Sequence, residues 1–291
     1  LDDAAARPDD ARMSAEIIDG KAVAKAIHEE VRAEAESLRA SGTTPGLATV
    51  LVGQDPASVS YVTAKQRACE NDLIESIGHH LPADTTQDHL LGLLAELRQD
   101  ERVDGILVQL PLPGHIDEKA ALAAVPVDKD VDGFHPENLG KLGLREAEAR
   151  FAPCTPSGVI ELLRRSDVEI SGANAVVLGR SKIVGLPAAL LLLRENATVT
   201  ICHSRTKDLA EQTQRADILV AAIGRANFVT ADMVREDAVV IDVGVNRVDD
   251  AKKKKGYRLA GDCDFGPVAE KARAITPVPG GVGPMTIAML M

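Results

Sequence analysis

Short apolar segments alternate with helical stripes of apolar residues through the first half of the chain. Four apolar residues after Asp19 recur at helical spacing, which predicts a helix to about residue 40 with one buried face. These four residues are Val23, Ile27, Val31 and Leu38. Strands are expected at 47–53, 74–80 and 103–109, and further helices from 56 onward, at 87–99 and at 117–124. Such alternation predicts one α/β domain.

The second half of the chain repeats this alternation with more strongly apolar strands. Thr155 to Gly158 are expected to cap a helix that runs from Val159 to Arg165 and leads into this part. Strands are expected near residues 174, 198, 217 and 238, with helices between them. Buried parallel strands joined by helices predict a doubly wound sheet.

A glycine turn joins the first of these strands to its helix. The strand 176–178 ends at Gly179, and an apolar helix begins near Leu186, with Pro187 tolerated in its first turn. The intervening sequence is G-R-S-x-x-x-G-x-P rather than the common dinucleotide fingerprint G-x-G-x-x-G. Free N–H groups and the positive helix end still make this turn a natural phosphate site.

The end of the next strand indicates which dinucleotide is bound. An NAD site usually carries an acidic residue about 20 residues after the glycine turn, and none is present here. Arg180, Ser204 and Arg205 instead supply two cations and a hydroxyl, which suit the 2′-phosphate of NADP. The competing interpretation is a surface loop that happens to be basic.

The predicted fold class is therefore α/β with two domains. We expect an N-terminal α/β substrate domain followed by a Rossmann-like doubly wound parallel-sheet NADP domain, with an active-site cleft between them. Residues 1–12 are acidic and alanine-rich and are expected to form a disordered extension. The first domain is expected at 13–155, completed by a helix at 283–291, and the second at 156–282.

Composition excludes several classes of function. The chain has 291 residues, a net charge of −11, 2% aromatic residues and no tryptophan, which argues against binding of polynucleotides. Its one basic run, Lys252 to Lys255, is expected in a solvated hairpin or loop. No apolar run approaches the roughly 20 residues of a membrane span, so a soluble protein is expected.

The cysteines indicate neither a metal site nor a redox motif. Cys69, Cys154, Cys202 and Cys263 lie far apart and form no C-x-x-C pair. Reduced thiols are therefore expected, as in the cytosol, and no cluster of metal ligands is apparent.

Candidate catalytic residues follow the first-domain strands. Ser58, Tyr61 and Lys65 share one face of the helix that Asp55-Pro56 begins. Residues so spaced are often ordinary surface, but ligands bind at the carboxyl ends of strands in open α/β sheets. Gln109 ends the third strand, and the proline-rich 110–113 after it predicts a rigid wall.

Three further segments resemble loops around a site. Asp132-Gly133 is a turn signal, for which a plain turn with an Asx hydrogen bond is the alternative reading. Gly224 and Val245 stand at ends of second-domain strands, where a cofactor would lie. The segment 276–284 combines three prolines with three glycines, which suits a loop that lines a site.

Seven motifs occur in order between Ile17 and Met291. They are Y-V-T-A-K, V-Q-L-P-L-P, D-V-D-G-F, G-R-S-K-I-V-G-L-P, C-H-S-R-T, D-V-G-V-N and T-P-V-P-G-G-V-G-P-M-T. Together they resemble the bifunctional methylenetetrahydrofolate dehydrogenase/cyclohydrolase family. The chain departs from the usual family pattern at Leu73-Ile74, where Gly-Ile is usual, and in a final helix shorter than that of most relatives.

The resemblance implies two reactions in one cleft. NADP⁺ oxidises 5,10-methylenetetrahydrofolate to 5,10-methenyltetrahydrofolate, which is then hydrolysed to 10-formyltetrahydrofolate. Lys65 would be the central catalytic residue, hydrogen-bonded by Gln109. Tyr61 would stack on the aminobenzoyl ring and help to order the lysine, and Asp132 would accept a hydrogen bond from the pteridine ring.

The resemblance also implies the wider site and its setting. Substrate-binding residues are expected at Ser58, Tyr61, Gln109, Leu110, Pro111, Asp132, Pro279, Gly280 and Gly281. Cofactor-binding residues are expected at Gly179, Arg180, Ser181, Ile183, Val184, His203, Ser204, Arg205, Gly224 and Val245. A cytoplasmic homodimer is expected, which acts on folates that can carry polyglutamate and which serves one-carbon metabolism and purine biosynthesis.

Three other functions compete with this reading. A monofunctional NADP-dependent methylenetetrahydrofolate dehydrogenase would keep the fold, but Lys65 and Gln109 are both present and argue against it. A folate or dinucleotide sensor without turnover would not need every catalytic position filled. Another two-domain NADP dehydrogenase would not require Tyr61, Asp132 and the Pro-Gly loop together.

Overall fold

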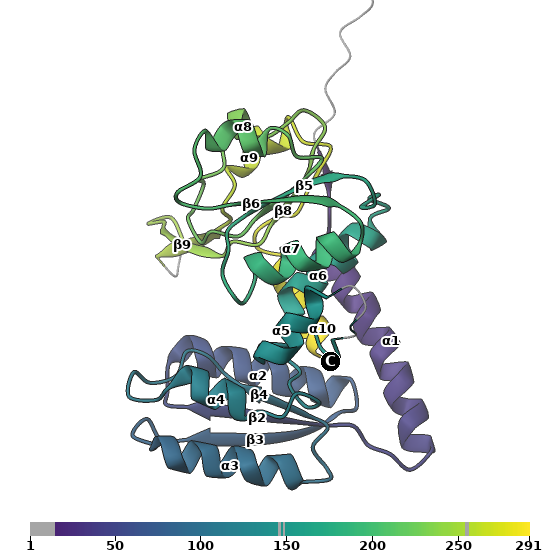
Figure 1. Cartoon of the computed structure of the whole chain (residues 1–291), viewed down its shortest axis with the longest axis vertical. Coiled ribbons are helices and arrows are strands. Elements are labelled where there is room, and N and C mark those ends of the chain that lie inside the picture. The colour runs from purple at the N-terminus through teal and green to yellow at the C-terminus, as the bar shows by residue number, and fades with distance from the viewer. Residues whose placement is uncertain (1–14, 145–146, 148, 254–255) are drawn as a thin grey trace, which may run out of the picture.

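Two parallel sheets, one in each lobe of the molecule, form the framework of the chain (Figure 1). The computed structural model describes residues 15–144, 147, 149–253 and 256–291. The extension predicted at residues 1–12 lies outside the described residues, as do positions 254 and 255 of the basic run.

The sheet of the first domain has the order β3-β2-β4, with all strands parallel. Its strands are β2 (Gly46–Val52), β3 (Glu75–Leu81) and β4 (Gly105–Val108). Its helices are α2 (Pro56–Asn71), α3 (Gln87–Gln99), α4 (Glu118–Ala124) and α5 (Pro136–Leu142). Helices cover both faces of the sheet (Figure 1), and every residue of β2 is therefore buried.

Alternate residues along β2 pack against different helices. Val50 packs with Leu90 and Leu94 of α3, whereas Leu47 packs with Cys69 of α2. This follows from the period of two in a strand, which sends successive side chains to opposite faces. The expected strands and helices of this domain are all present, within two residues of their predicted ends.

The second sheet has six parallel strands in the order β1-β11-β8-β7-β5-β6. The four predicted strands are β5 (Asn174–Leu178), β6 (Thr198–Cys202), β7 (Ile218–Ala221) and β8 (Val239–Asp242). The helical elements among them are α7 (Gly185–Arg194), α8 (Leu209–Thr213), η1 (Ala231–Met233) and α9 (Phe265–Ala269). The strand order reverses at β5, which pairs with both β6 and β7, so a ligand crevice is expected at the ends of these strands.

Two short strands extend this sheet beyond the prediction. β1 (Glu16–Ile17) pairs with β11 (Ala274–Ile275), which in turn pairs with β8. Each has only two residues, too few for an apolar pattern to reveal. β1 therefore lies in the sheet of the second domain, although the expected division placed residues 13–155 with the first.

An antiparallel hairpin projects from the second domain. It consists of β9 (Asn246–Asp249) and β10 (Tyr257–Ala260). The described lysines of the basic run, Lys252 and Lys253, lie in its exposed turn, as predicted.

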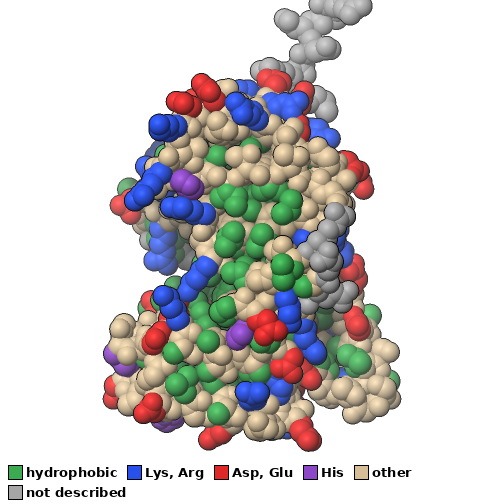
Figure 2. All heavy atoms as spheres, viewed as in Figure 1, with side chains coloured by type: hydrophobic (Ala, Val, Ile, Leu, Met, Phe, Trp, Pro, Cys, Tyr) green, Lys and Arg blue, Asp and Glu red, His purple; other side chains and the backbone are tan. Residues whose placement is uncertain are grey.

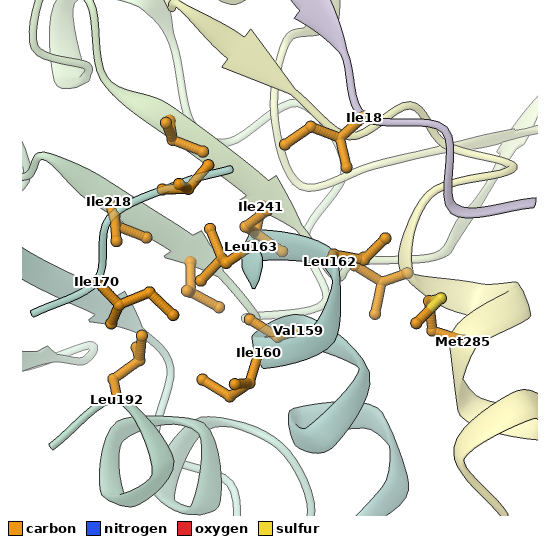
Figure 3. Packing of buried hydrophobic residues seen from close by; sticks show 14 of the residues in the cluster. Ile18, Val159, Ile160, Leu162, Leu163, Ile170, Leu192, Ile218, Ile241 and Met285 are labelled. Atoms are coloured by element: carbon orange, nitrogen blue, oxygen red, sulfur yellow. The ribbon is translucent and has the colours of Figure 1, made fainter. Parts of the chain in front are cut away.

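Three helices join the lobes: α1 (Gly20–Ala40), α6 (Cys154–Arg165) and α10 (Val282–Leu290). Figure 3 shows Leu162 of α6 near Met285 of α10, and Leu163 of α6 near Ile241 of the sheet. At its far end, Leu290 of α10 packs with Leu47 and other residues of the first domain. The final helix thus returns to the first domain, as the sequence indicated.

Helix α6 begins earlier than the sequence suggested. It starts at Cys154, so Thr155 to Gly158 are helical instead of forming a cap before Val159. A Cβ at Gly158 would lie 2.7 Å from Cβ of Met285, so this glycine allows α6 and α10 to pack closely. The prediction of a cap at these four residues is therefore wrong.

Helix α2 ends in an unusual backbone conformation. Leu73 has φ of 62°, and the N–H of Ile74 donates to the carbonyl of Cys69 at 2.8 Å. A left-handed residue at this place normally is glycine.

No helix in the described part of the chain is both long and apolar enough to span a membrane.

Candidate active site

Lys65 and Gln109 meet near the carboxyl ends of the first-domain strands. The Asp55 carboxylate caps α2 by accepting from the N–H of Ser58 at 2.8 Å, and Lys65 lies about two turns further along the helix. The Lys65 side chain is 8% exposed, and its Nζ donates to Oε1 of Gln109 at 3.1 Å. Gln109 directly follows β4, and its own Nε2 donates to the carbonyl of Leu110 at 2.7 Å. The amide is therefore held with its oxygen toward the lysine.

Asp132 belongs to the same group of charges. Burial raises its pKa to about 6, while the positive charge of Lys65 opposes that rise and the negative charge of Asp130 adds to it. In the part of the chain that the structure describes, no hydrogen bond to the Asp132 carboxylate is formed. Its oxygens remain free to accept from a ligand.

Asp130 shapes the loop that presents Asp132. Its buried carboxylate accepts from the N–H groups of Phe134 at 3.2 Å and His135 at 2.8 Å, and from Nδ2 of Asn138 at 2.9 Å. The Asx-type hydrogen bonds of this turn are thus made by Asp130 and not by Asp132. The plain-turn reading of Asp132 is wrong for its side chain.

Tyr61 and Ser58 occupy the helix face of Lys65 in different ways. The Tyr61 ring is 57% exposed one turn from the lysine, where it can serve as a platform for a flat ligand. Ser58 is buried at the start of the helix, where its N–H contributes to the cap. Leu110 is partly buried and Pro111 is exposed.

The Pro-Gly loop is attached to the beginning of α1. The N–H of Lys21 donates to the carbonyl of Gly280 at 3.1 Å, and a Cβ at Gly20 would lie only 1.8 Å from the carbonyl oxygen of Gly281. Gly280 has φ of 112°, a conformation that L side chains rarely adopt. Gly280 and Gly281 are buried, whereas Pro279 is exposed.

Cys154 lies among the first-domain charges, although no sequence motif indicated this. Its thiol donates to the carbonyl of Val131 at 3.4 Å, and its pKa is affected by the charges of Asp132 and Lys65. Burial raises the pKa of this thiol well above its ordinary value, so it stays protonated. We assign it a packing role.

A cavity of about 420 Å³ lies beside the ends of α5 and α7. The 420 Å³ cavity is lined by Leu142, Gly143, Leu193, Arg194 and Asn196, and it shares no lining residue with the predicted sites.

The cofactor cavity, of about 310 Å³, lies at the ends of β5, β6 and β7, where the strand order reverses. Five predicted cofactor residues line it: Gly179, Arg180, Ser181, His203 and Ser204. The other five predicted residues do not line it: Ile183, Val184, Arg205, Gly224 and Val245. Six lining residues were not predicted: Leu178, Leu209, Ala222, Ile223, Arg225 and Phe228. The sequence indicated these six only indirectly. Four of them lie at the end of a predicted strand or next to Gly179 or Gly224: Leu178, Ala222, Ile223 and Arg225.

The glycine turn requires its glycines because its backbone segments pack closely. A Cβ at Gly185 would lie 2.3 Å from the carbonyl oxygen of Gly179, and one at Gly179 would lie 2.2 Å from that of Ala222. The hydroxyl of Ser181 accepts from the N–H groups of Val184 at 3.1 Å and Gly185 at 3.3 Å. The residues that line the cavity include two arginines and no carboxylate, which fits the 2′-phosphate of NADP.

Two buried carboxylates support the loops beside this cavity. Asp242 ends β8 and accepts from the N–H groups of Gly244, Asp262 and Cys263. Burial raises the pKa of Asp242 to about 6, whereas its backbone donors oppose that rise. A Cβ at Gly244 would lie 2.1 Å from Oδ1 of Asp262, which explains the glycine in D-V-G-V-N.

The two lobes also contact each other through charged side chains. Nζ of Lys182, in the glycine turn between β5 and α7, lies 2.7 Å from Oε1 of Glu118 on α4. In Figure 2 the molecule is narrower between the two lobes, and hydrophobic side chains lie on the visible face of this narrow part. Within the described ranges, no group of three His, Cys, Asp or Glu residues is arranged to hold a metal ion.

Comparison with known proteins agrees with this arrangement. The family model described as tetrahydrofolate dehydrogenase/cyclohydrolase, catalytic domain, matches residues 18–132, and the NAD(P)-binding domain model of the same family matches residues 153–291. The bifunctional protein FolD of Salinibacter ruber is 56% identical over 95% of this chain and 93% of its own length. That of Magnetococcus marinus is 57% identical over 95% of both chains.

Solved structures show the same fold. The bifunctional FolD enzyme of Campylobacter jejuni superposes with a TM-score of 0.91 at 46% identity, covering 95% of this chain and 96% of its own. The Trypanosoma brucei enzyme, solved with NADP cofactor and an inhibitor, gives a TM-score of 0.90 at 45% identity, covering 96% and 95%. With both domains matched in order and close relatives along nearly its whole length, the chain belongs to the tetrahydrofolate dehydrogenase/cyclohydrolase family.

Proposed function

We propose that this protein oxidises 5,10-methylenetetrahydrofolate with NADP⁺ and hydrolyses the resulting 5,10-methenyltetrahydrofolate to 10-formyltetrahydrofolate. The observation that carries the proposal is the buried Lys65, hydrogen-bonded to Gln109 and electrostatically coupled to Asp132 beside an exposed tyrosine. The solved structures named above support it, since their titles describe the same pair of activities.

The oxidation requires positioning more than a strong base. Bound NADP⁺ supplies the acceptor for the hydride that leaves the methylene carbon. The product cation is shared between two folate nitrogens, so no proton has to be removed in this step. Tyr61 would support the aminobenzoyl ring, and Asp132 would accept a hydrogen bond from the pteridine and so fix its orientation.

The hydrolysis requires proton transfer, for which Lys65 is the proposed group. Water adds to the methenyl carbon and gives up both of its protons as the formyl C=O forms and one carbon–nitrogen bond breaks. One proton leaves to solvent, and the released nitrogen gains one. The Lys65 ammonium can give this proton, and its neutral amine can take one from the water. Gln109 holds Nζ in place through its 3.1 Å hydrogen bond.

Arg180 and Ser204 are proposed to bind the 2′-phosphate, and the turn at Gly179 and Ser181 to bind the pyrophosphate. The support is that all four residues line one cavity without a carboxylate. The remaining predicted cofactor residues, Ile183, Val184, Arg205, Gly224 and Val245, would then act outside this cavity.

The test follows NADPH and the methenyl intermediate separately after methylenetetrahydrofolate is mixed with NADP⁺. Lys65→Met should lower cyclohydrolase turnover by about 10²- to 10⁴-fold, as expected for loss of a proton-transfer group. Lys25→Met, at an exposed lysine of α1, serves as the matched control and should keep both activities. Normal hydrolysis in Lys65→Met would reject the assignment, and methenyl accumulation by the wild type would indicate a monofunctional dehydrogenase.

We further propose a homodimer formed through the second domain. β6 is an outer strand of the six-stranded sheet, and Ile201 in it is 38% exposed. Leu193 on the adjacent α7 is 56% exposed, so both apolar side chains would be covered by a second copy. Light scattering should give twice the monomer mass for wild type and a smaller mass for Ile201→Asp.

The wider setting is part of the same proposal. The product would supply one-carbon units, including those of purine biosynthesis, in the cytoplasm. The division into a substrate domain at 13–155 with 283–291 and a cofactor domain at 156–282 is supported by the two separate sheets, with β1 as the exception.

A further inference from the structure

Arg225 lines the cofactor cavity although no sequence motif singled it out. The residue follows β7 and shares the cavity with Arg180 and Ser204. Arg205, the second cation that the sequence predicted, does not line this cavity.

The backbone of Arg225 is held by a buried carboxylate. Asp262 is fully buried and accepts from the N–H groups of Ile223 at 2.7 Å, Gly224 at 3.0 Å and Arg225 at 2.8 Å. Nδ2 of Asn246 donates to the same carboxylate at 2.9 Å. Four donors on one side chain fix the turn, so the direction in which Arg225 leaves the backbone is fixed as well.

The side chain of Arg225 is positioned by an aromatic ring. Its guanidinium carbon lies 4.4 Å from the centroid of the Phe228 ring, and both residues line the cavity. In the described part of the chain, no carboxylate forms an ion pair with this guanidinium. One face of a planar cation is thus occupied, and the other is available to a second planar group.

The neighbouring residues indicate which planar group this is. Arg180 and Ser204 are proposed to bind the phosphate on the ribose 2′ position, and the adenine is attached to the adjacent ribose carbon. The base must therefore lie close to the 2′-phosphate, and apolar side chains of Leu178, Leu209 and Ile223 line the same cavity. We propose that Arg225 stacks on the adenine ring of NADP and that Phe228 is a positioning residue for it.

This inference rests on the proposed NADP site, but it can be tested without turnover. Isothermal titration calorimetry measures the binding of 2′,5′-ADP and of 5′-AMP to the full chain without folate. Arg225→Ala should weaken both ligands by about tenfold, because stacking on the base is common to them. Arg225→Lys should recover little of the loss, since an ammonium lacks the planar surface. Arg215→Ala, at an exposed arginine outside the cavity, is the control.

Two outcomes would overturn the proposal. If Arg225→Ala weakens 2′,5′-ADP far more than 5′-AMP and Arg225→Lys restores binding, the residue reads the phosphate instead of the base. If the binding of neither ligand is weakened, the guanidinium makes no contact with the nucleotide.

Phe228→Leu, which keeps an apolar side chain without the ring, should weaken the binding of both ligands by a smaller and equal factor.

Circular dichroism distinguishes a local effect from misfolding. Every Arg225 and Phe228 variant should keep the far-UV spectrum of the wild type. A failure of the wild type to oxidise methylenetetrahydrofolate, with 2′,5′-ADP binding intact, would remove the proposed function and leave the stacking inference standing.

Discussion

Asp132 is expected to lower the stability of the folded protein. Its replacement by asparagine should raise that stability. The carboxylate lies in the active site, where burial raises its pKa from 3.8 to about 6 despite the nearby charge of Lys65. Asparagine has nearly the same shape but no charge to desolvate. Asp132→Asn should therefore raise the melting temperature at neutral pH, while it raises the KM for folate because the carboxylate acceptor is lost.

The magnitude follows from the shift in pKa. A rise from 3.8 to about 6 corresponds to about 3 kcal/mol at roughly 1.4 kcal/mol per unit. Asp132 is partly exposed, so water reduces this cost, and we expect about 1–2 kcal/mol. For a chain of this size that amounts to about 2–6 °C in melting temperature.

The pH dependence gives the sharper test. Below pH 3.8 the carboxyl is protonated in both states and costs nothing. Between pH 3.8 and about 6 the unfolded state ionises first, so the folded state binds more protons and stability falls as pH rises. The difference in melting temperature between Asp132→Asn and wild type should be near zero at the acid end and constant above about pH 6.

Differential scanning fluorimetry across this range measures the difference directly, since other titrating groups cancel between the two proteins. Asp128→Asn, at an exposed aspartate of the same loop, should show no such trend. A difference that is independent of pH, or a variant less stable than wild type at pH 8, would refute the reasoning.

Two further predictions concern the backbone of α2 and the thiols. Because Leu73 has φ of 62°, Leu73→Gly should be more stable than Leu73→Ala by about 1 kcal/mol in thermal unfolding, the reverse of the order in a helix interior; equal stability would mean that the residue is not left-handed. Because Cys69, Cys154, Cys202 and Cys263 are buried, and burial raises the pKa of Cys69 to about 11, the native protein should not react with a thiol reagent until it is denatured. Rapid labelling of the native protein would contradict the burial.

The local sequence was sufficient to predict those features that depend on the spacing of residues along a helix or strand and on where a helix begins. The shared face of Tyr61 and Lys65 follows from their spacing on α2. The hydrogen bond between Lys65 and Gln109 is implied only by the resemblance to the family. Arg225 and Cys154 could not be found in this way. Their positions depend on packing between segments far apart in the chain, such as the support that Asp262 gives to the turn after β7.

The pair Asp130 and Asp132 shows where sequence reasoning reaches its limit. The two aspartates stand two residues apart in D-V-D-G-F, and nothing in their local sequence separates their roles. Asp130 accepts three hydrogen bonds, two of them from the backbone, whereas Asp132 faces the charge of Lys65 without such partners. The difference arises because α5 brings Asn138 to one carboxylate and α2 brings Lys65 toward the other. A loop aspartate becomes a candidate for substrate binding only when its neighbour has already satisfied the backbone of the turn.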